Sequence, residues 1–507
     1  MSRRGFLAAG CAAACAGAAG VLGAPRIVRA QDAAKPKIKI LYSLHEVVQA
    51  RPDWPNVGFD FGPVMERING ELAQGCPGFE FVTAMANGEE EAKKIIADDG
   101  AANIDGYIVY QMNCWNKVVQ TAAATGKPVL YADLQFAGSG GFLVYTAGFM
   151  RAAAPNVGFV ASSRPEDLIA AAQSFSLVKQ GGTVADFVAA VTKARIERTP
   201  KPGDLTCLPD PLKALSAEDC MARMKEMKIL AVRSQESGEE PDIMGIPIIK
   251  IPFAELNDAW TAADKEEAIA IADRWLKAAA ATIDVPREVM DQSAAMYLAE
   301  KALLDRHGAN AITINCLGGF YGGHIHAYPC LGFHELNNMG LVGGCECDTR
   351  SASCMAAFGA LANGRPGYIS DPVIDTAKRQ IIYAHCVASN KPFGPEGAAN
   401  PFEILTHSED RQGAAVRSIF PVGYMTTSVQ VAPDRKEILF HQAKAVANDP
   451  DDRACRTKLC GEPVGDIEKF FTQWDQWGWH RVTFYGDLKE PVFALADALG
   501  YTVVQEA

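Results

Sequence analysis

The sequence predicts an α/β protein in which two parallel-sheet units precede a third, mixed part with more strand than helix. Short apolar runs alternate with amphipathic stretches of helical period from about residue 38 to residue 315. From residue 402 onward, strands follow one another without long helices between them. The 507 residues, 49% hydrophobic and 21% charged, are enough for several ordinary globular domains.

The first predicted unit spans residues 31–155. We expect strands at 38–43, 79–82, 106–110 and 128–131, and helices at 61–73, 89–98 and 117–125. Parallel sheets of this kind bind ligands at the carboxyl ends of their strands. No G-x-G-x-x-G follows the first strand, which argues against a dinucleotide. The glycine-rich Gly138-Ser139-Gly140-Gly141 is interpreted as a plain loop with no helix behind it.

The second predicted unit spans residues 156–315, and the third spans residues 316–507. In the second we expect strands at 229–232, 248–251 and 311–315, with helices at 265–281 and 285–307. In the third we expect strands at 419–422, 436–440 and 482–485 and a closing helix at 490–499. Cys455 and Cys460, in a polar loop, are the pair of cysteines that we expect to form a disulfide.

Metal-capable side chains collect in the glycine-rich stretch of residues 329–348. Glu335, Glu346 and Asp348 lie within 14 residues of one another, and the glycines between them let the backbone turn tightly. Carboxylates brought together repel unless a positive charge lies between them. A divalent cation would satisfy them, with His385 and His480 as further ligands. The alternative is that Glu346 and Asp348 merely end a strand and face water.

The first 30 residues have the pattern of a twin-arginine signal peptide. Arg3-Arg4 precedes an apolar run rich in alanine and glycine, and Val28-Arg29-Ala30 suits a cleavage site. This predicts export to the periplasm with no stable membrane insertion after cleavage. If the signal is not used, the protein would be cytoplasmic. The net charge of -12, without a basic stripe, argues against a nucleic-acid partner.

Four short motifs together resemble the L-fucose isomerase and L-arabinose isomerase superfamily. They are Glu335-Leu336-Asn337, Cys345-Glu346-Cys347-Asp348, Ala384-His385-Cys386 and Gly478-Trp479-His480. The resemblance is specific at residues 329–348, 384–386 and 476–499, and only architectural before residue 310. It implies two Rossmann-like domains followed by a C-terminal catalytic domain with a β-barrel.

The resemblance also implies which residues act. Glu335 and Asp348 would be the catalytic, metal-binding carboxylates, and His480 and His385 would complete the ligands of an ion that is usually Mn²⁺. The spacing from Glu335 to Asp348 is shorter than in the fucose enzymes, so Glu346 is a rival for the first position. Trp479, which stands where the fucose enzymes have asparagine, and Glu346 are candidates for contact with the substrate.

The activity implied is that of a metal-dependent aldose–ketose isomerase acting on a small sugar. Such an enzyme moves one proton between adjacent carbons through a cis-enediol, which requires a base, an acid and a cation at the sugar oxygens. Because members of this superfamily form oligomers, the resemblance also implies a homo-oligomer. Two alternatives stay open: an exported, non-catalytic sugar-binding protein of the same fold, and a metal-dependent enzyme that acts on another polyol or sugar acid.

Overall fold

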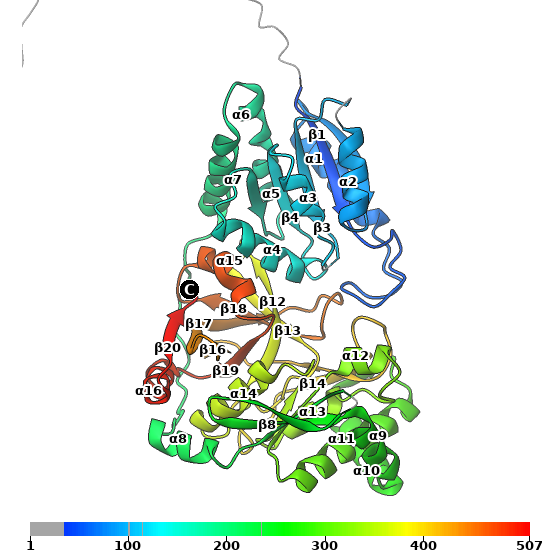
Figure 1. The fold of residues 1–507 in the computed structure, drawn as a ribbon, viewed down its shortest axis with the longest axis vertical. Helices are drawn as coiled ribbons and strands as arrows, with labels where there is room; N and C mark the ends of the chain where they lie inside the picture. The colour runs from blue at the N-terminus through cyan, green and yellow to red at the C-terminus, as the bar shows by residue number, and fades with distance from the viewer. Residues whose placement is uncertain (1–34, 100–101, 114, 235) are drawn as a thin grey trace, which may run out of the picture.

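The computed structural model describes residues 35–99, 102–113, 115–234 and 236–507, and Figure 1 shows them as three packed parts. The N-terminal unit forms one end of the molecule, the second sheet with its helices forms the other end, and a barrel lies between them. The predicted twin-arginine signal lies outside the described residues. None of the helices within the described ranges has the length and apolar character needed to cross a membrane.

A five-stranded parallel sheet forms the core of the N-terminal unit, in the order β2-β1-β3-β4-β5. Its strands are β1 (Lys37–Ser43), β2 (Glu80–Ala86), β3 (Gly106–Gln111), β4 (Val129–Asp133) and β5 (Val157–Val160). Its helices are α1 (Gly62–Gly75), α2 (Glu89–Asp98), α3 (Val118–Ala123), α4 (Ser139–Arg151), α5 (Pro165–Gln173), α6 (Phe175–Lys179) and α7 (Val184–Arg198). Strands β3 and β4 are buried along their whole length, and apart from their last residues, Gln111 and Asp133, they are mostly apolar on both faces. With β5, this sheet extends beyond residue 155.

Helix α4 corrects the loop predicted at residues 138–141, because the helix begins at Ser139. The prediction was wrong because glycines were taken as a sign of a turn, whereas here they permit close packing. A Cβ atom on Gly140 would lie 1.6 Å from Cη2 of Trp479. At the start of the helix, Ser139 Oγ donates to Asp133 Oδ2 at 2.8 Å. The beginning of α4 is therefore tied to the end of β4 and lies directly under the Trp479 indole.

The second sheet has the order β11-β10-β6-β8-β7, with only β7 antiparallel to its neighbour. Its strands are β6 (Ile229–Ser234), β7 (Gly238–Ile243), β8 (Ile246–Pro252), β10 (Ala311–Ile314) and β11 (Val342–Gly344). The helices of this part are α8 (Ala217–Met224), α9 (Phe253–Ala262), α10 (Lys265–Ala278), α11 (Arg287–His307), α12 (Cys316–Tyr321), α13 (Cys330–Asn338) and α14 (Thr349–Leu361). With β11, this sheet extends beyond residue 315.

Six strands close into a barrel in the order β16-β19-β12-β13-β18-β17, because β16 also pairs with β17. They are β12 (Tyr368–Asp375), β13 (Gln380–His385), β16 (Met425–Ala432), β17 (Glu437–Asn448), β18 (Thr457–Pro463) and β19 (Arg481–Tyr485). After helix α16 (Lys489–Leu499), β20 (Thr502–Gln505) adds in parallel to β17. The predicted fold class, parallel-sheet units followed by a mixed part with a barrel, is confirmed.

Two local predictions in the third part are wrong. The strand expected at residues 419–422 is instead β15 (Ala415–Ser418), which joins β14 (Phe402–Leu405) and β9 (Ala281–Ile283) in a small sheet. Pro421 has no N–H to donate to a strand ladder, which suits a position outside the strand. The predicted disulfide is not formed, because Cys455 and Cys460 are both free thiols. Cys460 lies within β18, and the Sγ of Cys455 accepts from the Ser408 hydroxyl at 3.8 Å.

Candidate metal centre

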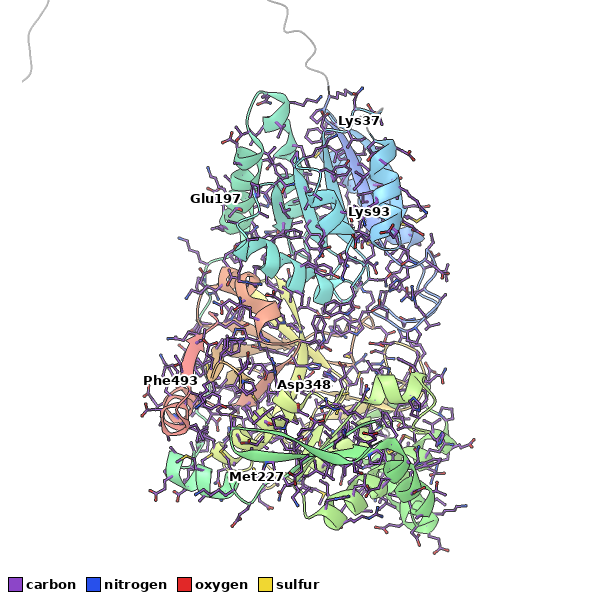
Figure 2. All side chains as sticks on the ribbon, viewed as in Figure 1. Lys37, Lys93, Glu197, Met227, Asp348 and Phe493 are labelled. Atoms are coloured by element: carbon purple, nitrogen blue, oxygen red, sulfur yellow. The ribbon has the colours of Figure 1, made fainter. Side chains whose placement is uncertain are left out.

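Four side chains converge close to where the barrel meets the second sheet. Glu346 follows β11, Asp371 lies in β12, His385 ends β13, and His480 directly precedes β19. One ligand-capable atom from each lies within 4.8 Å of the others. Strand β12 pairs with β13 on one side and β19 on the other, so three of these groups come from three adjacent barrel strands. Figure 2 labels Asp348, the neighbour of this cluster, near the middle of the molecule.

The distances in the cluster are short enough for one shared cation. His480 Nε2 lies 3.2 Å from Asp371 Oδ1 and 3.5 Å from Glu346 Oε2. His385 Nε2 lies 3.8 Å from Glu346 Oε1 and 3.9 Å from Asp371 Oδ2. Three of the inward atoms, Asp371 Oδ1, His385 Nε2 and His480 Nε2, are buried and make no hydrogen bond within the described chain. Buried polar atoms without partners are unfavourable, and carboxylate with imidazole is a donor set that fits a divalent transition-metal ion.

Asp348 lies beside the cluster and orients His480. The Nδ1 of His480 lies 2.9 Å from Asp348 Oδ2, and Asp348 also caps helix α14 by accepting from the Ser351 amide at 3.0 Å and the Ser351 hydroxyl at 2.7 Å. Burial acts to raise the pKa of Asp348, but the hydrogen bonds with His480 and Ser351 outweigh it and lower this pKa to about 2. A carboxylate that holds one imidazole nitrogen leaves the other, Nε2, to face the cluster, as in many carboxylate–histidine–metal arrangements.

Glu346 differs from the other three members in exposure and in charge state. Its side chain is 29% exposed, whereas the side chains of Asp371, His385 and His480 are at most 4% exposed. Burial within the cleft raises the pKa of Glu346 to about 7, with the charges of Asp371 and Asp348 adding to the shift and His480 opposing it. Of the four groups, Glu346 is therefore the one that solvent reaches and that can change protonation near neutral pH.

The two histidines are shifted in opposite directions. Burial lowers the pKa of His385 to about 4, because the charge of Asp371 opposes the shift only in part and the charge of His480 adds to it. Burial also acts to lower the pKa of His480, but Asp371, Asp348 and Glu346 together outweigh it, and the pKa is raised. In the protein without an ion, His480 therefore carries the positive charge that the surrounding carboxylates require.

The structure does not bring Glu335 to this cluster. Glu335 lies on α13, and its carboxylate accepts from Arg274 Nη1 at 2.8 Å and from Trp275 Nε1 at 3.0 Å, both on α10. Its carboxylate is bound to residues of α10 and is not part of the cluster, so the metal-binding and catalytic role predicted for it finds no support in its surroundings. Glu346, its rival in the sequence, takes the position in the cluster.

Asp371 is the cluster member that the sequence prediction missed. It lies in β12, a strand buried along its whole length, between Ser370 and Pro372. A proline in the middle of a run argues against a strand, and this hid the element. The available signal was the acid itself, since a carboxylate within an apolar strand needs a partner or a cation.

Trp479, a candidate for substrate contact, lies next to His480 and spans from the barrel to the N-terminal unit. Its indole packs on Gly140 of α4, and its ring centroid lies 4.9 Å from that of Trp115, in the loop after β3. Trp115 is 53% exposed. The two rings form an aromatic surface that solvent reaches, and one of them belongs to the residue that directly precedes His480.

Fold and site together define the class of protein: a three-part α/β chain with a carboxylate- and imidazole-lined centre suited to a divalent cation. The chain is similar to sulfoquinovose isomerase of Clostridium sp. (strain MSTE9), with 25% identity over 225 residues, which are 43% of this chain and 48% of that protein. The chain thus matches about half the length of this curated relative. No family model matches the sequence.

Solved structures give weaker matches. The transcriptional regulator CelR in complex with cellobiose matches at 11% identity and a TM-score of 0.17, over 55% of this chain and 66% of that chain. A LacI-family regulatory protein from Chloroflexus aggregans matches at 10% identity and a TM-score of 0.16, over 55% of this chain and 77% of that chain. At such TM-scores neither likeness bears on fold or function.

Proposed function

We propose that this protein is a metal-dependent aldose–ketose isomerase that acts through a cis-enediol. One observation carries the proposal: three buried ligand atoms that make no hydrogen bond within the described chain converge beside one solvent-reached carboxylate with a pKa of about 7. The similarity to a sulfoquinovose isomerase supports a sugar as the substrate.

Asp371, His385 and His480 would hold the ion, and Asp348 would keep His480 oriented through its Nδ1. Mn²⁺ is the ion that we propose, since the Asp371 carboxylate and the two imidazoles give it the mixed oxygen and nitrogen ligands that it accepts. When bound, the ion supplies positive charge that stabilises the negative charge developing on the sugar oxygens.

Glu346 is the group that we propose to move the proton. In the reaction the base takes the proton from C2 while O1 gains a proton, which gives the cis-enediol. The base then returns its proton to C1, and the O2 hydroxyl loses its proton to leave a C2 ketone, so that the proton lost from O2 balances the one gained by O1. No atom is gained or lost. A carboxyl with a pKa of about 7 is populated in both forms at neutral pH, which suits a group that must accept and then donate.

The aromatic surface of Trp479 and Trp115 is proposed to contact the carbon face of the sugar. It lies beside His480, and each ring offers apolar area next to the polar cluster. This arrangement would place the hydroxyls of a sugar toward the carboxylates and its C–H groups toward the indoles.

The test begins with the metal content of the purified full-length protein, followed by ketose formation from a panel of aldoses, sulfoquinovose included, with and without added manganese. Asp371→Asn should lose the ion, and Glu346→Gln should lower turnover by about 10² to 10⁴ at saturating manganese. Glu335→Gln is the matched control, because it removes a carboxylate outside the cluster and should leave both readouts near those of the parent. A wild-type protein that binds aldoses without converting any of them would refute the proposal.

We further propose export by the twin-arginine route and assembly as a homo-oligomer. The Arg3-Arg4 pair before an apolar run supports export, and the resemblance to the fucose and arabinose isomerases supports assembly. Cell fractionation should find the protein in the periplasm, and replacement of both arginines by lysine should keep it in the cytoplasm. Light scattering on the purified protein measures the mass of the assembly, and the mass of a monomer would contradict the second part.

A further inference from the structure

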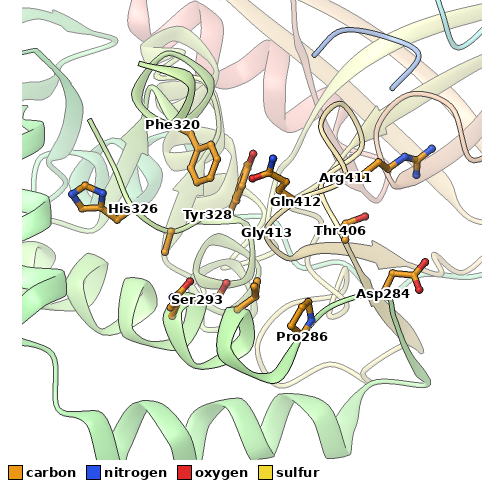
Figure 3. A pocket seen from close by; sticks show the side chains of 13 residues that line it. Asp284, Pro286, Ser293, Phe320, His326, Tyr328, Thr406, Arg411, Gln412 and Gly413 are labelled. Carbon is orange, nitrogen blue, oxygen red and sulfur yellow. The ribbon is translucent and has the colours of Figure 1, made fainter. Parts of the chain in front are cut away.

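A cavity of about 330 Å³ lies apart from the metal centre, between α11, α12 and the segment of residues 406–413 (Figure 3). None of the four cluster residues lines it. A volume of this size lies within the range of small-molecule sites in proteins. The cavity is therefore large enough for a compact organic molecule.

The cavity wall carries polar groups that have no partner. Ser293, on α11, is 1% exposed, and its buried hydroxyl makes no hydrogen bond with any described residue. Gln412 is exposed; its backbone makes hydrogen bonds, but its side-chain amide makes none with a described residue. Asp284 also lines the cavity and is exposed, and its carboxylate has no side-chain partner among the described residues. A hydroxyl, an amide and a carboxylate thus surround the cavity, and each is able to hydrogen-bond a guest.

Aromatic rings line one side of the cavity, and the backbone at Gly413 packs closely against one of them. The Phe320 ring packs on the Tyr328 ring with centroids 4.0 Å apart. Gly413 has a φ of +60°, and a Cβ there would lie 1.8 Å from Cδ2 of Tyr328, so only glycine lets the segment pass this close to the ring. The wall is therefore a fixed, closely packed surface.

The cavity and the metal centre have no residue in common. The cavity is bounded by Thr406, Arg411 and Gln412 from the segment of residues 406–413. In the same segment the ring of His407 stacks on the ring of Tyr328, with centroids 5.1 Å apart and an interplanar angle of 22°, so this part of the wall is packed against the aromatic face.

The charge of the lining is close to neutral. The Arg411 guanidinium already binds Asp452 Oδ2 at 2.7 Å and Asn56 Oδ1 at 2.5 Å. It is therefore not available to bind the Asp284 carboxylate or an anionic guest. An anion would therefore gain little here. An aromatic face together with a hydroxyl, an amide and a carboxylate suits a neutral ring that is apolar on one side and carries hydroxyls at its edge.

From these contacts we propose that the cavity is a second binding site, distinct from the metal centre, for an uncharged pyranose sugar. The carbon face of the ring would lie on Phe320, and its hydroxyls would reach Ser293, Gln412 and Asp284. This inference does not depend on the isomerase proposal, because it concerns binding without conversion.

The test uses methyl α-pyranosides of glucose, galactose, mannose and fucose, which cannot open to an aldose and so cannot be isomerised. Their binding to the full-length, metal-free protein is titrated by ligand-observed NMR. At least one should bind saturably. Gln412→Ala should weaken it about tenfold, the effect of one lost hydrogen bond to a polar group, and Ser293→Leu, which fills the cavity, should abolish it.

Two variants serve as controls. Gln74→Ala removes an equally exposed amide on α1, far along the chain from the cavity, and should bind as the parent does. Asp371→Asn disables the metal centre and should also leave binding unchanged. Since Ser293→Leu alters a buried position, its melting temperature is measured, and Gln412→Ala decides the question if that variant does not fold.

Three results would overturn the proposal. One is that no pyranoside binds at millimolar concentration. Another is that binding is lost in Asp371→Asn but kept in Gln412→Ala, which would place the sugar at the metal centre. The third is a Gln412→Ala protein that changes its oligomeric mass without any pyranoside binding to the parent, which would assign the cavity to a contact between copies of this chain.

Discussion

Replacing Asp348 by Asn separates an orienting carboxylate from a metal ligand. The change removes a charged acceptor 2.9 Å from Nδ1 of His480 but keeps an oxygen that can still cap α14 through the Ser351 amide. Partners that orient a metal-binding histidine typically contribute 10-fold to 100-fold in metal affinity. We therefore expect the manganese Kd to rise by that factor, or about 1.4 to 2.7 kcal/mol, while turnover returns when manganese is saturating.

The assay is a manganese titration by calorimetry, followed by turnover measured across the same range of manganese concentration. Asp264→Asn is the matched control, because Asp264 also caps a helix, α10, by accepting from the Glu267 amide at 2.8 Å, and lies outside the cluster. Both variants should melt within a few degrees of the parent. The orienting role is refuted if Asp348→Asn binds manganese as tightly as the parent. It is also refuted if no concentration of manganese restores turnover, since Asp348 would then be a direct ligand or the catalyst.

The remaining predictions concern pH and packing. Metal binding must displace the proton of His480, whose pKa is raised well above its ordinary value. The manganese Kd should therefore rise about tenfold for each unit by which the pH falls, whereas a Kd that is flat from pH 6 to 8 would contradict the assigned charge of His480. Gly140→Ala should displace the Trp479 indole, cost about 1 to 3 kcal/mol in urea unfolding, and raise KM more than it lowers kcat. Gly148 lies on the same helix, and a Cβ there meets nothing within 4 Å, so Gly148→Ala should lower neither stability nor substrate binding. Equal effects of Gly140→Ala and Gly148→Ala would refute the packing argument.

The elements of the two parallel sheets could be predicted because their signal is local. Strand β3 is a continuous apolar run, and α2 and α11 have an apolar stripe of helical period, so both kinds of element are visible in a short window. Closure of the barrel is different, since it rests on the pairing of β16 with β17 and on strands far apart in the chain. The barrel was predicted from the resemblance to the isomerases, whereas the residues alone indicated only a part of the chain rich in strands.

The site could be predicted in part. Glu346, His385 and His480 were named because each stands in a short polar motif, and all three lie in the cluster. Asp348, which was expected to be a catalytic metal ligand, lies beside the cluster and contacts His480 instead. Asp371 was not predicted as a ligand because the strand that contains it, β12, was itself not predicted. Glu335 was chosen from the spacing of a motif, and spacing carries no information about the face of α13 on which the side chain lies. Pairings between distant strands decided the membership of the cluster.

The backbone at Glu346 shows why that position in particular suits the chemistry. Glu346 and Cys347 have φ angles of +59° and +52°, a left-handed conformation that glycine adopts without strain and that costs other residues about 1 to 3 kcal/mol each. The turn is held by the pairing of β10 with β11 and by the Cys347 amide, which donates to the Ile314 carbonyl at 3.0 Å. Glycine would relieve the strain but would remove the carboxylate. Since a right-handed conformation would send the side chain in another direction, the strained turn is what directs Glu346 toward Asp371 and His480 while leaving it open to solvent. The sequence therefore named the side chain as a candidate but carried no signal for the backbone conformation that directs it.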